Sequence, residues 1–309
     1  MRVFVAGASG AIGSRLVPQL VARGHEVVGT SRSAGKSDRL AALGAEAVVL
    51  DLLDRDGVRK AVEAAQPEAI IHQATALSGL SEIKNPDQAF AQTNRLRTEG
   101  TDALLAAGRD VGVSRFLAQS YASWPYARQG GPVKSEEDPL DPTPVSTMRE
   151  TLAAIRHVEQ AALGAGGIAL RYGGFYGSPD DAQLELVRKR RFPIVGDGGG
   201  IWSFIHLDDA AAATVLALED GAPGIYNIVD DEPAPVREWL PALAQAIDAK
   251  PPRHVPRWLA RILAGEAGVA LMTEIRGASN AKAKRELGWT LRFPSWRQGF
   301  PAAYGSGRV

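Results

Sequence analysis

Short runs of β-branched and other apolar residues alternate with alanine-rich amphipathic stretches through the first half of the chain. The apolar runs predict strands at 3–6, 26–30, 47–50, 69–72 and 115–119. The stretches between them predict helices that begin near residues 11, 37, 55 and 87, the last extending to Arg109. This alternation is typical of βαβ units, so we predict an α/β protein with a doubly wound parallel sheet whose ligands bind at the carboxyl ends of the strands.

The pattern loosens in the second half. Residues 130–144 are rich in proline, glycine and acidic side chains, which predicts a surface loop. Further helices are predicted at 147–163, 208–218, 236–247 and 257–272, and further strands at 167–172, 201–206 and 224–229. We expect the strand at 224–229 to return to the main sheet. The predicted domains are therefore a dinucleotide-binding domain, residues 1–174 with 201–229, and a smaller, discontinuous C-terminal α+β substrate domain, residues 175–200 and 230–309.

Composition narrows the classes of function. Lys+Arg and Asp+Glu both total 35, so the formal net charge is zero and a nucleic-acid partner is not expected. The chain has no cysteine, which excludes disulfides, thiolate metal sites and cysteine nucleophiles. Its five histidines lack metal-ligand spacing, so no metal is expected. Because no leader or membrane-spanning apolar run is present, we expect a cytoplasmic protein that binds no membrane.

A glycine motif joins the first predicted strand to the first predicted helix. Gly7, Gly10 and Gly13 have the spacing GxxGxxG in VFVAGASGAIGSRL. The first glycine permits a tight turn, the second lets the backbone approach a pyrophosphate, and the third allows close helix packing. The predicted cofactor loop therefore consists of Gly7, Ser9, Gly10, Ala11, Ile12 and Gly13. The alternative is a tight strand-to-helix turn without a ligand.

The end of the second strand indicates which dinucleotide is bound. An acidic residue there would hold the ribose 2′-hydroxyl of NAD, but this chain has Thr30-Ser31-Arg32. Arg32 can pair with a 2′-phosphate, and Ser31 and Lys36 can add donors, so NADP(H) is preferred and NAD(H) remains possible. The alternative for Arg32 is a solvated loop side chain. Asp51, followed by Leu52, ends the third strand and could accept from the adenine amino group or cap the next helix.

Several segments, in this order and spacing, make the chain similar to the extended short-chain dehydrogenase/reductase superfamily, in particular its NAD(P)-dependent epimerase/dehydratase group. They are GASGAIG at 7–13, DLLD at 51–54, IIHQAT at 70–75, the run at 99–123, LRYGGFYG at 170–177, WSFIHLDDAA at 202–211, YNIVDDEP at 226–233 and AKRELGW at 283–289. The resemblance implies a Rossmann-type NAD(P) domain in which Gln73, Ala74 and Thr75 form part of the cofactor wall. It also implies a homodimer through helices that match 87–109 and 147–163.

The catalytic pair of that family, Tyr-x-x-x-Lys, has no counterpart in TPVSTMRETLAAIRHVEQ. If Glu159 is aligned with the family's later glutamate, Thr151 and Ile155 stand where Tyr and Lys belong. We therefore predict Tyr121, after the fifth strand, as a substitute acid/base, with Ser120 or Ser123 orienting a carbonyl or hydroxyl group. The alternative is a loop tyrosine packed under the substrate domain.

The predicted substrate contacts are Tyr172, Tyr176 and Trp202, each of which could instead only pack in the core. Together these features predict an NADP(H)-binding oxidoreductase or epimerase/dehydratase-like enzyme. Its substrate would be a small carbonyl or hydroxyl compound, with a nucleotide sugar among the candidates. The alternative is a non-catalytic NADP-binding redox sensor or partner-binding regulator.

Overall fold

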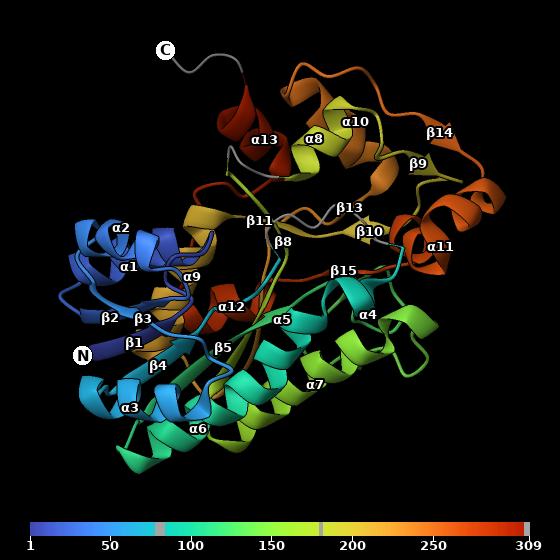
Figure 1. Ribbon diagram of the computed structural model, residues 1–309. Coiled ribbons are helices and arrows are strands. Elements are labelled where there is room, and N and C mark those ends of the chain that lie inside the picture. The colour runs from blue at the N-terminus through green and yellow to red at the C-terminus, as the bar shows by residue number, and fades with distance from the viewer. Residues whose placement is uncertain (78–83, 179–181, 306–309) are drawn as a thin grey trace.

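The computed structural model describes residues 1–77, 84–178 and 182–305, which fold around a seven-stranded parallel sheet (Figure 1). The strand order is β12-β7-β5-β4-β1-β2-β3. The strands are β1 (Arg2–Ala6), β2 (Glu26–Ser31), β3 (Glu46–Val49), β4 (Ala69–His72), β5 (Arg115–Tyr121), β7 (Ile168–Tyr172) and β12 (Gly224–Ile228). The predicted Rossmann-type α/β fold is confirmed.

Helices cover both faces of this sheet, because its central strands are apolar on both sides. One face carries α1 (Gly13–Ala22), α9 (Leu207–Asp220) and α12 (Ala281–Leu287), and the other carries α3 (Arg55–Ala65), α6 (Thr101–Asp110) and α7 (Arg149–Gly164) (Figure 1). The short segments η1 (Ala34–Lys36) and α2 (Ser37–Ala42) follow β2, and η3 (Ser146–Met148) precedes α7. Each helix turns an apolar stripe to the sheet; α3, for example, buries Val58, Val62 and Ala65.

The direction of strand addition reverses between β1 and β4. From β1 the chain proceeds to β2 and β3 on one side, and from β4 it proceeds to β5, β7 and β12 on the other. Connections that leave neighbouring strands in opposite directions open a crevice at the carboxyl ends of those strands. This crevice positions the site described below.

A smaller lobe lies over the carboxyl ends of the strands (Figure 1). It contains α8 (Ala182–Arg188), α10 (Val236–Ala246), α11 (Arg257–Thr273) and α13 (Trp296–Tyr304). Its strand pairs are β8 (Gly174–Tyr176) with β11 (Phe204–His206), β9 (Ile194–Val195) with β14 (His254–Val255), and β10 (Ile201–Trp202) with β13 (Ala234–Pro235). Trp239, Trp296, Phe204 and Phe300 fill the core of the lobe.

Three segments differ from the pattern-based prediction. The strand predicted at 201–206 is two strands, because Ser203 separates β10 from β11 and its hydroxyl accepts from the Ala278 N–H (2.8 Å). The loop predicted at 130–144 contains β6 (Val133–Lys134), which pairs with β15 (Gly277–Ala278). The single helix predicted to end at Arg109 is divided into α4 (Pro86–Ala89), α5 (Ala91–Arg95), the π-helical segment η2 (Leu96–Gly100) and α6.

Two features bear on association. In the part of the chain that the structure describes, no helix is both long and apolar enough to cross a membrane. The helices α6 and α7 lie side by side, and an exposed pair joins them, with His157 Nε2 2.7 Å from Asp102 Oδ1. The homodimer expected through 87–109 and 147–163 stays a prediction.

A buried polar network ties β5, α7, β7 and β12 together. The guanidinium of Arg171 donates to both carboxylate oxygens of Glu159, each at 2.7 Å, and to the Tyr126 hydroxyl at 2.9 Å. That hydroxyl donates to Asn227 (2.7 Å), and Ser120 donates to Glu159 (2.6 Å). The network satisfies charges that would otherwise be buried without partners.

Replacing Glu159 therefore tests what the network contributes. Glu159→Ala leaves the Arg171 charge buried without its carboxylate, and we expect the free energy of unfolding to fall by about 3–5 kcal/mol in urea denaturation. The control Asp102→Ala breaks the exposed pair with His157 and should cost less than about 1 kcal/mol. Equal losses for the two variants would contradict this account.

Candidate functional site

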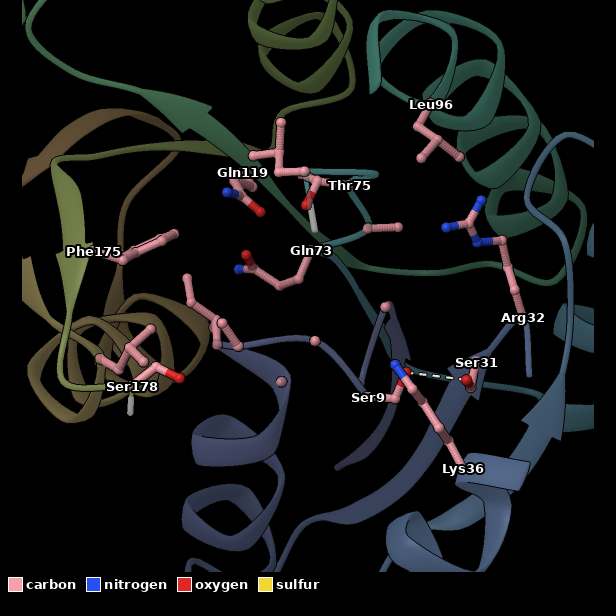
Figure 2. Close-up of a pocket in the computed structure, with 18 of the residues that line it drawn as sticks. Ser9, Ser31, Arg32, Lys36, Gln73, Thr75, Leu96, Gln119, Phe175 and Ser178 are labelled. Atoms are coloured by element: carbon pink, nitrogen blue, oxygen red, sulfur yellow. Dashed lines mark hydrogen bonds between the residues drawn. The ribbon is translucent and has the colours of Figure 1, made fainter. Parts of the chain in front are cut away.

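A cavity of about 690 Å³ opens at the crevice between β1 and β4 (Figure 2). It is bounded by the glycine loop after β1, the end of β2, the segment after β4 and side chains of the smaller lobe. The predicted cofactor residues that line it are Gly7, Ser9, Gly10, Ala11, Ile12, Gly13, Ser31, Arg32, Leu52, Gln73, Ala74 and Thr75. Tyr176 and Trp202, which we predicted as substrate contacts, line it as well. Residues from segments far apart in sequence therefore meet at one site.

The glycine loop is held by close backbone packing. Gly7 has φ of +84°, and a Cβ there would lie 2.6 Å from the Ala74 Cα. A Cβ on Gly13 would lie 2.3 Å from the Ala8 carbonyl oxygen. At Gly10, by contrast, the nearest atom would be the Gly7 oxygen at 3.2 Å. Gly7 and Gly13 are thus required by the fold, whereas Gly10 keeps one side of the loop open to the cavity.

The first turn of α1 points its N–H groups at the same space. No side chain of the described residues caps this turn, and the turn contains no acidic residue. Uncapped N–H groups and the positive end of the helix dipole favour an anionic group such as a pyrophosphate. The Gly7 N–H donates to Thr30 Oγ1 (3.1 Å), which connects the loop to the end of β2.

Positive charge lies at the β2 end of the cavity. Figure 2 shows Arg32 and Lys36 beside Ser31, whose hydroxyl accepts from Ser9 at 3.0 Å. Both cationic side chains are exposed, and they are the charged residues among the described residues that line the cavity. A ligand with an additional phosphate would therefore meet two cations here and no carboxylate.

Asp51 lies outside the residues that line the cavity. Its carboxylate accepts from the Leu53 N–H at 3.0 Å. The cap of α3 is Asp54, which accepts from the Gly57 N–H at 3.1 Å. The adjacent Leu52, in contrast, forms part of the cavity wall.

The other end of the cavity is mostly apolar, with a few amides. Phe175, Tyr176, Phe192 and Trp202 contribute aromatic surface, and Gln73 and Gln119 project from the ends of β4 and β5 (Figure 2). Such a wall, with few polar groups, suits a small organic molecule.

Gln73 connects the cavity to the core below it. Its amide donates to the Tyr172 hydroxyl (2.9 Å), which is bonded to Thr214 (2.7 Å). Tyr172 therefore supports Gln73 from beneath and does not itself line the cavity. The Gln73 Oε1 atom is buried and has no hydrogen-bond partner among the described residues, so it is available to accept from a ligand.

Burial keeps the titratable groups near this end neutral. It raises the pKa of Tyr172 and of Tyr176 far above the usual tyrosine value. Burial also lowers the pKa of His72, the last residue of β4, to about 4. These three side chains are therefore uncharged at neutral pH.

The three predicted catalytic residues differ in their surroundings. Ser120 donates to Glu159, and Ser123 donates to the carbonyl oxygens of Ile201 (3.2 Å) and Arg276 (2.9 Å). The Tyr121 hydroxyl makes no hydrogen bond to a described residue. Burial raises the pKa of Tyr121 to about 12, and the charge of Arg97 opposes that increase. None of the three lines the cavity, but Tyr121 alone retains a hydroxyl without a protein partner in the described structure.

Thr151 and Ile155 are both fully buried on α7. Thr151 donates to Asp87 (2.7 Å) and accepts from Asn94 (3.1 Å), so both roles of its hydroxyl are occupied. An acid/base function for Thr151 is therefore disfavoured.

Sequence reasoning missed several residues at this site. Gln119, Phe175 and Phe192 line the cavity although no motif singled them out. For Gln119 a usable signal existed, because successive side chains of a strand point to opposite faces of the sheet. Since Ser120 faces α7, its neighbour Gln119 points to the other face. Phe175 lies in the LRYGGFYG segment, between the predicted contacts Tyr172 and Tyr176, so a local signal existed for it as well. For Phe192 no local signal existed, since folding of the smaller lobe brings it to the cavity.

Comparisons with known proteins agree with this geometry. The model of the NAD dependent epimerase/dehydratase family matches residues 3–229. The chain is 43% identical to a 3-diazoavenalumate denitrifying reductase of a Streptomyces species, over 97% of this chain and 99% of that protein. It is 31% identical to a 2-alkyl-3-oxoalkanoate reductase of Stenotrophomonas maltophilia, over 81% and 76%. The structure of Thermus thermophilus UDP-glucose 4-epimerase with NAD is 26% identical, with a TM-score of 0.76 and 98% of each chain covered.

Substitution of Gly10 tests the loop directly. Because its added Cβ would meet little protein, Gly10→Ala should leave the melting temperature within a few degrees of wild type, yet weaken dinucleotide binding by about tenfold or more. The measurement is fluorescence titration with NADPH and with NADH. In the contrasting variant, Gly13→Ala, the clash with Ala8 should lower the melting temperature. Unchanged affinity of Gly10→Ala for both dinucleotides would exclude this loop as the binding site.

Proposed function

The chain belongs to the NAD-dependent epimerase/dehydratase family, and from this premise we propose that it is an NADP(H)-dependent reductase of small carbonyl compounds. The glycine loop, the uncapped start of α1 and the wall formed by Gln73, Ala74 and Thr75 suit a dinucleotide. The observation that carries the cofactor preference is the pair of cations at the β2 end, Arg32 and Lys36, without a lining carboxylate among the described residues. NAD(H) is the alternative cofactor.

Titration of two variants tests the cofactor preference. We expect wild type to bind NADPH at least about tenfold more tightly than NADH, because charge-assisted hydrogen bonds to the 2′-phosphate contribute about 2 kcal/mol. Arg32→Ala should lose about that advantage for NADPH and leave NADH binding unchanged. Arg39→Ala removes the same charge from an exposed position of α2 outside the cavity and serves as the control. Equal affinity of wild type for the two dinucleotides would refute the preference.

Reduction is favoured over nucleotide-sugar chemistry by the far end of the cavity. A nucleotide sugar carries a diphosphate, and the lining residues described at that end include aromatic side chains and amides but no cation. The basic sequence RKRR at 188–191 could have met a diphosphate, but none of its four residues lines the cavity. Arg188 pairs with Glu185, and Arg190 donates to the Pro251 carbonyl oxygen. The relatives named above at 43% and 31% identity are both named reductases. A compact, partly apolar carbonyl compound is the substrate class that fits.

In this proposal the chain's own groups orient the substrate and supply a proton. NADPH, when bound, provides the hydride. Gln73 and Gln119 can hydrogen-bond polar groups at the inner end of the cavity, and Tyr176 and Trp202 provide apolar surface. Tyr121 is the proposed proton donor to the substrate oxygen, because its hydroxyl is unpartnered in the described structure and protonated at neutral pH.

Tyr121→Phe tests that assignment. We expect kcat for carbonyl reduction to fall by about 100-fold or more, with the dissociation constant for NADPH unchanged. The matched variant Ser120→Ala removes a hydroxyl bonded to Glu159, so it should lower stability and keep most of the activity per folded molecule. Retention of kcat in Tyr121→Phe would assign the proton to another group.

The pH profile gives a second check on the same residue. With the pKa of Tyr121 near 12 and that of His72 near 4, the protonated donor is fully populated at neutral pH. The rate of reduction should therefore stay level between about pH 6 and 9, and fall only as the pH approaches the pKa of Tyr121. A break near pH 7 would point to a different acid.

The alternative function is a non-catalytic sensor of NADP(H). Such a protein would fill the space beyond the nicotinamide with its own side chains, whereas this cavity extends to Phe175 and Trp202. The open space supports turnover. A protein that binds NADPH and reduces no aldehyde or ketone across a broad panel would favour the sensor.

A further inference from the structure

Arg97 is a buried cation without a partner among the described residues. Its side chain is only 7% exposed, and its Nε has no hydrogen-bond partner among the described residues. Its guanidinium makes no hydrogen bond or ion pair within the described part of the chain. Arg171, which is comparably buried, has two bonds to Glu159 and one to Tyr126. Arg97 therefore has none of the compensation that Arg171 receives.

This arrangement is costly for the folded protein. A charge removed from water without a counter-ion costs several kcal/mol. Burial lowers the pKa of Arg97 to about 10, but the group is still charged at neutral pH. The nearby carboxylate of Glu159 is already neutralised by Arg171. Unpaired buried charges of this kind are typical of sites whose partner is a ligand.

The position of Arg97 relates it to the cavity. It lies in η2, the π-helical segment between α5 and α6, and such segments occur often at functional sites. The preceding residue, Leu96, lines the cavity, and its carbonyl oxygen accepts from His72 Nε2 at 3.1 Å. The positive charge of Arg97 contributes to lowering the pKa of His72 and opposes the increase in the pKa of Tyr121. These two residues are the last of β4 and β5. The guanidinium therefore lies at the carboxyl ends of these two strands.

A second unpartnered donor lies within its electrostatic reach. The Tyr121 hydroxyl makes no hydrogen bond to a described residue, and the positive charge of Arg97 opposes the increase that burial causes in the pKa of Tyr121. Guanidinium groups bind carboxylates strongly, so Arg97 can hold an acidic group of the substrate while the Tyr121 hydroxyl donates to the carbonyl oxygen.

We propose that Arg97 forms a subsite for a carboxylate group of the substrate at the carboxyl ends of β4 and β5, beside the part of the cavity wall that Leu96 forms. The guanidinium binds the carboxylate oxygens, and the substrate supplies the counter-ion that Arg97 lacks among the described residues. The inference deepens the proposed function, on which it relies to identify the molecule that carries the carboxylate. It narrows the substrate class to carbonyl compounds that bear an acidic group.

Benzoate and benzamide are suitable probes, because they share size and shape and differ in charge. We expect calorimetric titration to show that wild type binds benzoate at least about tenfold more tightly than benzamide, with and without NADPH. Arg97→Met should lose that difference, and Arg97→Lys should retain part of it. Arg95→Met is the control, since Arg95 lies two residues away, exposed and paired with Glu99.

Thermal stability provides a readout that is independent of turnover. Without ligand, Arg97→Met should melt at a higher temperature than wild type, because the substitution removes an uncompensated buried charge. Benzoate should raise the melting temperature of wild type and not that of Arg97→Met. A lower melting temperature for unliganded Arg97→Met would instead assign Arg97 a structural role and overturn the proposal.

Two other outcomes would also overturn it. One is benzoate binding by wild type no tighter than benzamide binding, and this outcome depends on no variant. The other is a loss of NADPH affinity in Arg97→Met with benzoate binding unchanged, which would assign the guanidinium to a cofactor phosphate. Failure of the proposed function can be told apart from failure of the carboxylate subsite. If the proposed function fails, wild type binds no NADPH, but the titrations without cofactor still compare benzoate with benzamide.

Discussion

Close contact between backbone segments at the centre of the sheet is the constraint on which the rest of the site depends. The turn after β1 packs against the segment after β4 so tightly that a Cβ on Gly7 would lie 2.6 Å from Ala74. Gly13 brings α1 equally close to Ala8. These contacts direct the start of α1 into the crevice between β1 and β4, where the strand order reverses. The cavity forms there because the carboxyl ends of the parallel strands lie at the same edge of the sheet.

The sequence predicted the sheet well because its signals are local. Buried parallel strands appear in the sequence as short apolar runs. The glycine spacing indicates a tight turn formed by residues that are close in sequence. Most of the cofactor wall follows from the same signals. The aromatic wall of Phe175, Phe192 and Trp202 depends instead on how the smaller lobe folds over the sheet. Likewise, the helix predicted to end at Arg109 is interrupted by the π-helical segment η2, which packs against α7 and ends at Gly100. The single glycine of this segment does not by itself indicate a π-helix.

Two sets of buried polar groups lie at the site and in the network beside it. Glu159, Arg171, Tyr126 and Asn227 satisfy one another and fasten four elements of the main domain. Gln73 Oε1, the Arg97 guanidinium and the Tyr121 hydroxyl lack partners among the described residues, and they belong to the ends of β4 and β5 or to η2 beside them. Stability and ligand recognition therefore rely on different polar groups that are only a few residues apart. This separation lets the rigid network hold the strands while neighbouring groups remain available to a ligand.

The division at Ser203 has a mechanical consequence. The residues before it pair with β13 of the smaller lobe, and those after it pair with β8 and lead into α9 on the main sheet. The chain returns to the smaller lobe after β12, and β15 anchors it again to β6 before α12 packs on β12. With so many covalent crossings, the two parts have no single hinge about which to swing apart. Several crossings restrict rigid-body opening of one lobe, so we expect ligands to enter and leave by local displacement of loops and side chains at the rim.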